Sequence, residues 1–155
     1  MNEGTLVAIH LIRAAEAPPE PVAEARAVPG KGIEGDRYFE RTGKYSAKNG
    51  PEREVTLIEE EAIEAARRDY GIDLGPGQSR RNLLTRGVSL NHLVNREFEI
   101  GEVRLRGLEL CEPCGHLEAL TVKGVRLALV HRGGLRAQVL RGGTFRVGDS
   151  VRPAS

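Results

Sequence analysis

The sequence has no tryptophan, and its 155 residues include only three phenylalanines and three tyrosines. Valine, leucine and isoleucine must therefore fill most of the core. Acidic and basic residues nearly balance, 22 against 23, which gives a formal net charge of +1. Nucleic-acid-binding domains usually carry a basic excess or a basic stripe, so we expect no nucleic-acid partner.

Long apolar runs are missing too. No stretch approaches the roughly 18 to 20 apolar residues that a transmembrane helix needs, so we expect no membrane association. The polar start, Met1 to Gly4, is not followed by an apolar segment with a cleavage site, which predicts a cytoplasmic protein without a signal peptide. The GxGxxG and Walker motifs are also absent, which leaves a nucleotide-binding fold without support.

Short apolar segments separated by glycine turns dominate the chain, and they predict a mainly β domain of barrel type. Residues 14–25, with prolines at 18, 19 and 21, are expected to form a loop. Residues 144–151 predict a closing hairpin. The strands are expected at 6–13, 27–28, 54–58, 79–84, 98–100, 103–110, 125–130, 135–140 and 144–147.

One principal helix is expected over residues 59–70. Apolar residues in it recur at helical spacing, acidic residues fill its first turns, and Gly71 can end it. Its charges are best explained as a solvated face, so this helix needs no functional explanation.

The only two cysteines, Cys111 and Cys114, form a C-x-x-C motif directly after an expected strand. A thiolate can ligate a soft metal, carry sulfur as a persulfide, or form a redox disulfide. A free cysteine can also be a small buried apolar residue. Structural zinc is disfavoured because it normally needs four ligands, and only His116 offers a possible third. A thioredoxin-like role would need a βαβ setting, which the pattern does not provide.

Two further segments carry candidate binding residues. In Arg80-Arg81-Asn82, arginine suits phosphate and asparagine can bind an amide-like ring edge; the alternative is a surface arginine pair. In Gly35-Asp36-Arg37-Tyr38, Arg37 can donate to an anion while Asp36 fixes the loop; the alternative is an Asx-type turn with an exposed arginine. His10 lies in an apolar strand and is expected to be a core or edge residue with its hydrogen bonds satisfied.

Five segments, taken in order, resemble the MOSC domain, the C-terminal domain of molybdenum-cofactor sulfurases. The resemblance runs from about Leu6 to Val151 and predicts a single MOSC domain over residues 1–155. The segments are Gly32-Ile33-Glu34-Gly35-Asp36-Arg37-Tyr38, Arg53-Glu54-Val55-Thr56-Leu57-Ile58, Arg80-Arg81-Asn82-Leu83, Phe98-Glu99-Ile100-Gly101 and Cys111-Glu112-Pro113-Cys114.

This resemblance implies a β-barrel that binds the molybdenum cofactor, a pterin with a dithiolene and a phosphate. Cys114 matches the family's key cysteine, which ligates molybdenum in some relatives and is proposed to carry a persulfide in others. Arg80 and Asn82 match the R-x-N pair that contacts the cofactor, and Arg37 matches a cofactor-contacting arginine. Family members often have His where Tyr38 stands.

Two functions follow from the resemblance. The first is a molybdoenzyme that reduces N-hydroxylated small molecules, with Cys114 as metal ligand and a separate protein as electron donor. The second is a sulfur-carrier or cofactor-handling module that presents a Cys114 persulfide, loaded by a sulfur donor, to a partner. An anion-binding barrel with an inert Cys114 is the non-enzymatic alternative.

Overall fold

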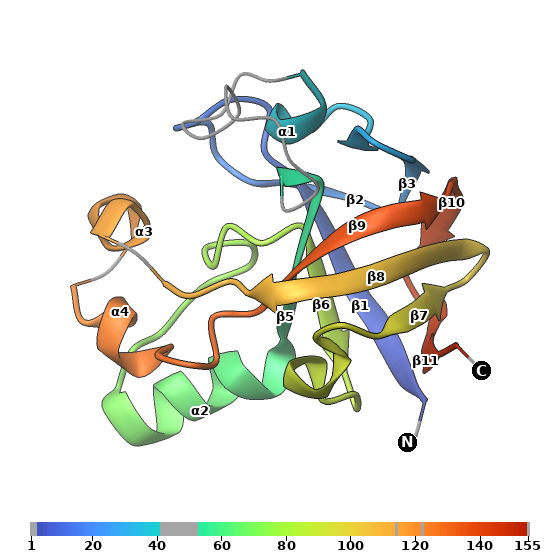
Figure 1. The fold of residues 1–155 in the computed structure, drawn as a ribbon. Helices are drawn as coiled ribbons and strands as arrows, with labels where there is room; N and C mark the ends of the chain where they lie inside the picture. The colour runs from blue at the N-terminus through green and yellow to red at the C-terminus, as the bar shows by residue number, and fades with distance from the viewer. Residues whose placement is uncertain (1–2, 41–52, 114, 122, 155) are drawn as a thin grey trace.

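A computed structural model describes residues 3–40, 53–113, 115–121 and 123–154 of the chain. Its centre is a closed β-barrel, so the prediction of a mainly β fold of barrel type is confirmed (Figure 1). Within the described residues seven strands form the ring in the order β11-β7-β8-β9-β5-β6-β1, and β11 pairs with β1 to close it. These strands are β1 (Gly4–Leu11), β5 (Val55–Glu59), β6 (Leu83–Arg86), β7 (Glu97–Ile100), β8 (Val103–Leu110), β9 (Leu135–Arg141) and β11 (Ser150–Pro153).

The strands alternate inward and outward residues, as a barrel wall requires. Along β9, for example, Leu135, Ala137 and Val139 are buried, while Arg136 and Gln138 between them are only partly buried. The inward side chains form one continuous core. It includes Leu6, Ile9, Leu57, Leu83, Phe98, Ile100, Leu105 and Phe145.

All neighbouring pairs in the ring are antiparallel except β5 and β6, which run parallel. A parallel pair needs a crossover connection, and α2 (Glu60–Tyr70) supplies it. This is the expected helix at 59–70. It ends at Gly71, whose φ of 66° is left-handed, as is common at helix C-termini. Its buried residues Ala62 and Ala66 belong to a second apolar cluster, which also includes Ile58, Leu117, Val125 and Leu129.

Residues 125–130 were expected to form a strand, and this prediction is wrong. They contain a short helix, α4 (Val125–Ala128), which lies beside α2 (Figure 1). Val125, Ala128 and Leu129 are the buried residues, and their i, i+3, i+4 spacing is helical rather than alternating. The segment is too short for that period to be distinguished in the sequence.

The prediction of a closing hairpin at 144–151 is also wrong. β10 (Gly143–Arg146) pairs with β3 (Glu24–Val28), and β3 pairs with β4 (Gly32–Ile33), which makes a separate small sheet. The following strand, β11, instead pairs with β7 and β1 in the barrel. The reversal at Gly148 therefore joins two sheets, because each flanking strand has a better partner elsewhere in the chain.

The proline-rich segment 14–25 is not entirely loop. Glu20–Val22 forms β2, an edge strand that pairs with β1. Pro21 lies opposite His10 there, and an edge strand tolerates a proline because its outer side has no ladder to complete. The expected strand at 79–84 begins only at Leu83, so Arg80 and Asn82 precede it.

Three short helical segments complete the described chain. They are α1 (Arg37–Glu40), η2 (Leu90–Leu93) and α3 (Gly115–Leu120). In the part of the chain that the structure describes, no helix combines the length and apolar character needed to cross a bilayer.

Candidate functional site

Asp36 fixes the loop that enters α1. Its side chain is fully buried, and Oδ1 accepts hydrogen bonds from the Ile12 amide at 3.0 Å and from Asn82 Nδ2 at 2.9 Å. The other oxygen, Oδ2, accepts from the Tyr38 amide at 3.2 Å. Asp36 thereby connects the end of β1, the start of α1 and the segment before β6, and it sets where the next residue, Arg37, projects.

Asn82 is also fully buried, and its amide is engaged on both sides. Nδ2 donates to the His10 carbonyl at 3.2 Å as well as to Asp36. Oδ1 accepts from the Thr56 amide at 3.2 Å and from the Thr56 hydroxyl at 3.1 Å. These four bonds use the whole hydrogen-bonding capacity of an asparagine side chain. Asn82 therefore holds three strands and the Asp36 loop together, and its contact with a cofactor stays a prediction.

Tyr38 lies between two arginines from distant parts of the chain. The Arg37 guanidinium sits over its ring, 4.3 Å from the centroid, and Arg37 Nη2 donates to Tyr38 Oη at 3.2 Å. Arg136, the second residue of β9, is hydrogen-bonded to the same side chain. Burial tends to lower the pKa of Arg136, but the nearby Cys111 and Tyr38 groups outweigh it and raise that pKa overall. Arg136 therefore stays charged.

Arg80 has a left-handed backbone, with φ at 61°, which is uncommon for a residue with a side chain. Its guanidinium donates to the carbonyls of Ala17 at 2.8 Å and Ala15 at 2.9 Å, which ties the proline-rich segment to the site. Burial and the neighbouring Arg37 guanidinium lower the pKa of Arg80. Two like charges gathered in a partly buried place favour an anion between or beside them.

A cavity of about 240 Å³ adjoins Arg80. It lies between the proline-rich segment and α3, the helix that follows the C-x-x-C turn. Its lining comprises Glu16, Pro18, Pro19, Gln78, Arg80, Leu120 and Thr121.

Arg81 fixes the main chain of the cysteine turn. Its Nε donates to the Gly133 carbonyl at 2.7 Å, and Nη2 donates to the Cys111 carbonyl at 3.0 Å. The two backbones approach so closely that a Cβ on Gly133 would collide with the Cys111 carbonyl. Arg81 is therefore a buried positioning residue rather than one of a surface arginine pair.

Cys111 is only 1% exposed, and its amide donates to the Gly134 carbonyl at 2.7 Å. Its thiol is thus packed inside the protein. Cys114, which carries the central sequence prediction, lies outside the described residues. Within the described ranges no three histidine, cysteine or acidic side chains converge as a metal site.

Together, Arg37, Arg80 and Arg136 form what we call the arginine cluster, with Tyr38 bonded to two of them. Asp36 is the buried carboxylate in contact with Arg37, at 3.5 Å. The other carboxylates near the cluster, Glu109 at 4.0 Å from Arg136 and Glu16 near Arg80, are exposed. Positive charge therefore exceeds negative charge in the interior, which suits an anionic ligand. The sequence alone did not reveal Arg136, because the pattern around it is that of an ordinary strand with an outward-facing arginine.

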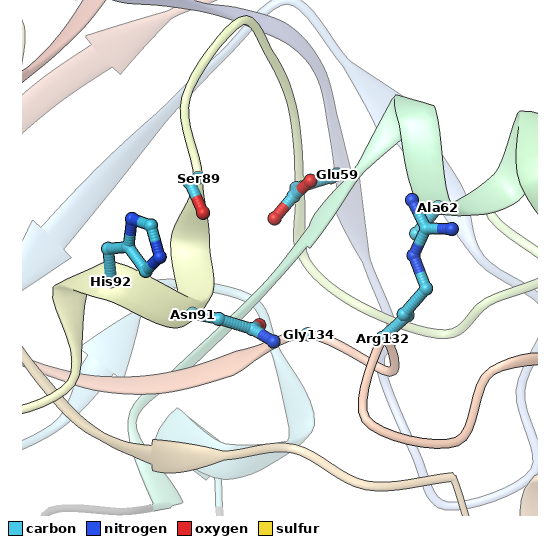
Figure 2. Close-up of a pocket in the computed structure, with 7 residues that line it drawn as sticks. All are labelled: Glu59, Ala62, Ser89, Asn91, His92, Arg132 and Gly134. Atoms are coloured by element: carbon cyan, nitrogen blue, oxygen red, sulfur yellow. The ribbon is translucent and has the colours of Figure 1, made fainter. Parts of the chain in front are cut away.

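A second, polar cavity of about 270 Å³ lies where β5 meets α2, apart from the arginine cluster (Figure 2). Glu59 lines it, and its carboxylate accepts a hydrogen bond from the Leu90 amide at 3.0 Å. Figure 2 shows Ser89 and His92 on one side of Glu59 and Arg132 on the other. Burial raises the pKa of Glu59, partly offset by its bond to Leu90.

Several solved structures share this fold at low sequence identity. The YuaD protein of Bacillus subtilis superposes with a TM-score of 0.77 at 14% identity, over 97% of this chain and 94% of that one. YiiM of Geobacillus stearothermophilus gives 0.73 at 14% identity, over 98% and 75% of the two chains. YiiM of Escherichia coli gives 0.70 at 17% identity, over 97% and 70%. At these identities the likeness concerns the fold alone.

No curated protein sequence matches this chain. The sequence profile of the MOSC domain does match it, over residues 44–152. That range covers more than half of the chain, including Arg80, Asn82 and the C-x-x-C turn. The chain therefore belongs to the MOSC domain family, the family of the molybdenum-cofactor sulfurase C-terminal domain.

Proposed function

We propose that this protein binds the molybdenum cofactor at the arginine cluster and reduces N-hydroxylated small molecules. One observation carries the proposal: Arg37, Arg80 and Arg136, which are far apart in the sequence, lie around Tyr38 beside the cysteine turn. Membership of the MOSC family supports the choice of cofactor.

The residues present fit such a group. Its phosphate needs fixed cationic donors, and arginine guanidiniums are suited to phosphate because they donate along parallel N–H bonds. Arg80 uses two of its five N–H donors on the carbonyls of Ala15 and Ala17, which leaves others for a ligand. Asn82 contributes indirectly, by holding Asp36 and thus Arg37 in position.

Cys114 is assigned as the metal ligand, because a soft thiolate suits a metal that already has sulfur ligands. When bound, the cofactor would supply a molybdenum centre that exchanges electrons in pairs. The overall reaction consumes two electrons and two protons, breaks the N–O bond of the N-hydroxylated substrate, and releases the amine and water. The electrons come from a separate donor protein.

The chain's own residues have three tasks in this scheme. The arginine cluster binds and orients the anionic cofactor. Tyr38 orients two of the guanidiniums, and Arg81 holds the carbonyls of Cys111 and Gly133 so that the turn leading to Cys114 is fixed.

The test is the molybdenum and pterin content of protein purified from cells that make the cofactor. We expect near-stoichiometric molybdenum in the wild-type chain and its loss in Cys114→Ser. Arg80→Ala should lose both molybdenum and pterin, whereas the exposed-arginine control Arg146→Ala should keep them. Retention of the cofactor by Arg80→Ala would contradict the assignment of the arginine cluster.

The sulfur-carrier function gives a different result in the same samples. It predicts a Cys114 persulfide, seen as an added 32 Da that reduction removes, and a molybdenum content that does not depend on Cys114. Reduction of an N-hydroxylated amine by the loaded wild-type chain with a chemical electron donor would favour the reductase, and persulfide without such activity would favour the carrier.

A further inference from the structure

A larger cavity, of about 410 Å³, lies apart from the arginine cluster. It is bounded by α2, by the loop at 74–79 and by β1 with its edge strand β2. Ser79 and Arg81 line this cavity, whereas Arg80, the residue between them, lines the smaller cavity beside α3. Neighbouring residues of one segment thus serve two separate cavities.

The lining of this larger cavity is mainly apolar, and its size falls in the range of small-molecule sites. Its apolar residues come from five different parts of the fold, namely β1, β2, α2, the loop at 74–79 and β6. They are Ala8, Pro21, Ile63, Leu74, Pro76 and Leu84.

The two charged residues in the lining do not favour an ion. Glu60 bears a negative charge and is bonded to Arg86 at 2.6 Å. Arg81 bears a positive charge and donates to the carbonyls of Gly133 and Cys111. Their charges cancel, and each already has a partner, so the cavity suits a neutral molecule.

The ring of His10 is a polar group in this lining that takes no part in the arginine cluster. It is 5% exposed and lines the cavity, and its ring makes no hydrogen bond with the residues that the structure describes. Its burial confirms the expectation of a core or edge residue, and the satisfaction of its hydrogen bonds stays a prediction. Burial lowers the pKa of His10, so its ring is neutral near pH 7 and offers one donor and one acceptor. The ring nitrogens are not among the fully buried unpaired atoms of the described residues, so they are open to the cavity, where a ligand can replace water as their hydrogen-bond partner.

We propose that this cavity binds a neutral, mainly apolar ring compound whose single polar group, a hydroxyl or an amide, hydrogen-bonds to the His10 ring. The proposal is independent of the molybdenum cofactor, because it rests on a different cavity and on the His10 ring, which has no task in the proposed reaction. It predicts selectivity of a definite kind: apolar bulk is needed, charge is rejected, and one hydrogen bond adds affinity.

The experiment is an NMR titration of the ¹⁵N-labelled protein with three probes of similar size. 4-Ethylphenol is neutral with one hydroxyl, ethylbenzene lacks the hydroxyl, and 4-ethylbenzoate is charged. We expect saturable shifts at the cavity residues with 4-ethylphenol, about tenfold weaker binding of ethylbenzene, and no binding of 4-ethylbenzoate. One hydrogen bond of ordinary strength corresponds to roughly that tenfold difference.

Three variants make the test specific. His10→Leu should weaken 4-ethylphenol binding to the level of ethylbenzene and leave ethylbenzene unchanged. Ala8→Leu should fill the cavity and abolish the binding of both 4-ethylphenol and ethylbenzene, while the His10 ring stays in place. Val147→Leu changes an exposed valine that does not line the cavity, and it should alter the binding of neither probe.

Three results would overturn the proposal. The first is the absence of shifts at the cavity residues up to the solubility of 4-ethylphenol. The second is equal binding of the three probes, and the third is binding that Ala8→Leu does not reduce, since either would indicate adsorption elsewhere on the surface. Cys114→Ser should bind 4-ethylphenol as the wild type does, which separates this proposal from the cofactor assignment.

Discussion

Replacing Asn82 with alanine should destabilise the protein severely, although the residue is an expected cofactor contact. The substitution removes four hydrogen bonds at a fully buried position. It leaves the Thr56 amide and the His10 carbonyl without those partners, and it takes one donor from Asp36. A buried polar group left unpaired costs about 1–3 kcal/mol. Two such groups give roughly 4 kcal/mol, a large part of the about 5–15 kcal/mol that stabilises an ordinary domain.

Urea denaturation, followed by circular dichroism, measures this loss directly. A thermal scan should show the melting temperature falling by about 8–16 °C, since about 1 kcal/mol shifts a chain of this size by roughly 2–4 °C. Asn91→Ala is the matched control, because Asn91 is exposed and its side chain makes one hydrogen bond within the described residues, to the His131 carbonyl at 2.9 Å. It should cost about 0.5 kcal/mol or less.

The reasoning fails if Asn82→Ala unfolds with nearly the same free energy as Asn91→Ala. That result would mean that the four bonds contribute little, and that the Asn82 amide is available to a ligand after all. A large loss in the apo protein would instead show that Asn82 supports the site by holding Asp36 and Arg37 in place.

Three further predictions concern the cysteine turn, Glu59 and the end of α2. In a Cys114→Ser background, Arg81→Ala should speed the reaction of the Cys111 thiol with Ellman's reagent at least tenfold, because the carbonyls that Arg81 holds are released. The control Arg146→Ala should leave the rate unchanged. Equal rates for the two variants would contradict the role of Arg81. Burial raises the pKa of Glu59, so the folded chain keeps that proton to higher pH than the unfolded chain does. The free energy of unfolding should therefore fall as pH rises from about 4.5 through the folded-state pKa, and urea unfolding of Glu59→Gln across this range should show a flatter dependence; an identical slope would refute the assignment. Gly71→Ala should lower the free energy of unfolding, measured in urea, by about 1 kcal/mol. The residue has a φ of 66°, and a Cβ there would meet no neighbour within 4 Å, so backbone strain alone acts. An unchanged free energy would mean that the end of α2 relaxes around the alanine.

Much of the barrel was predictable because its signals are local. β7, β8 and β9 match the expected strands within a residue, and α2 matches the expected helix, since alternation, helical spacing and terminal glycines are all encoded by neighbouring residues. The failures are short or depend on partners. Residues 125–128 span one turn, too few for a period, and β10 pairs with β3, more than a hundred residues earlier.

In the candidate site, too, some residues were predictable from local motifs and others only from the structure. Sequence motifs identified Arg37, Arg80 and Asn82 as candidates, and the structure brings them together through Asp36. No motif identified Arg136, whose neighbours are ordinary strand residues, or the role of Arg81 in the cysteine turn. These roles depend on the meeting of β9, the segment before β6 and the end of β8.

The sequence by itself determined the fold class, the principal helix and the two positions where thiol chemistry is available, because composition, periodicity and residue type are properties of the chain alone. Only the tertiary structure decided which way each polar side chain faces. It buried Asn82 with all four of its bonds inside the protein, placed Arg136 beside Tyr38, and put the His10 ring in the lining of a mainly apolar cavity. The physical reason is that a hydrogen bond or a cavity is made by groups from distant segments, and their meeting is fixed by strand pairing rather than by local sequence.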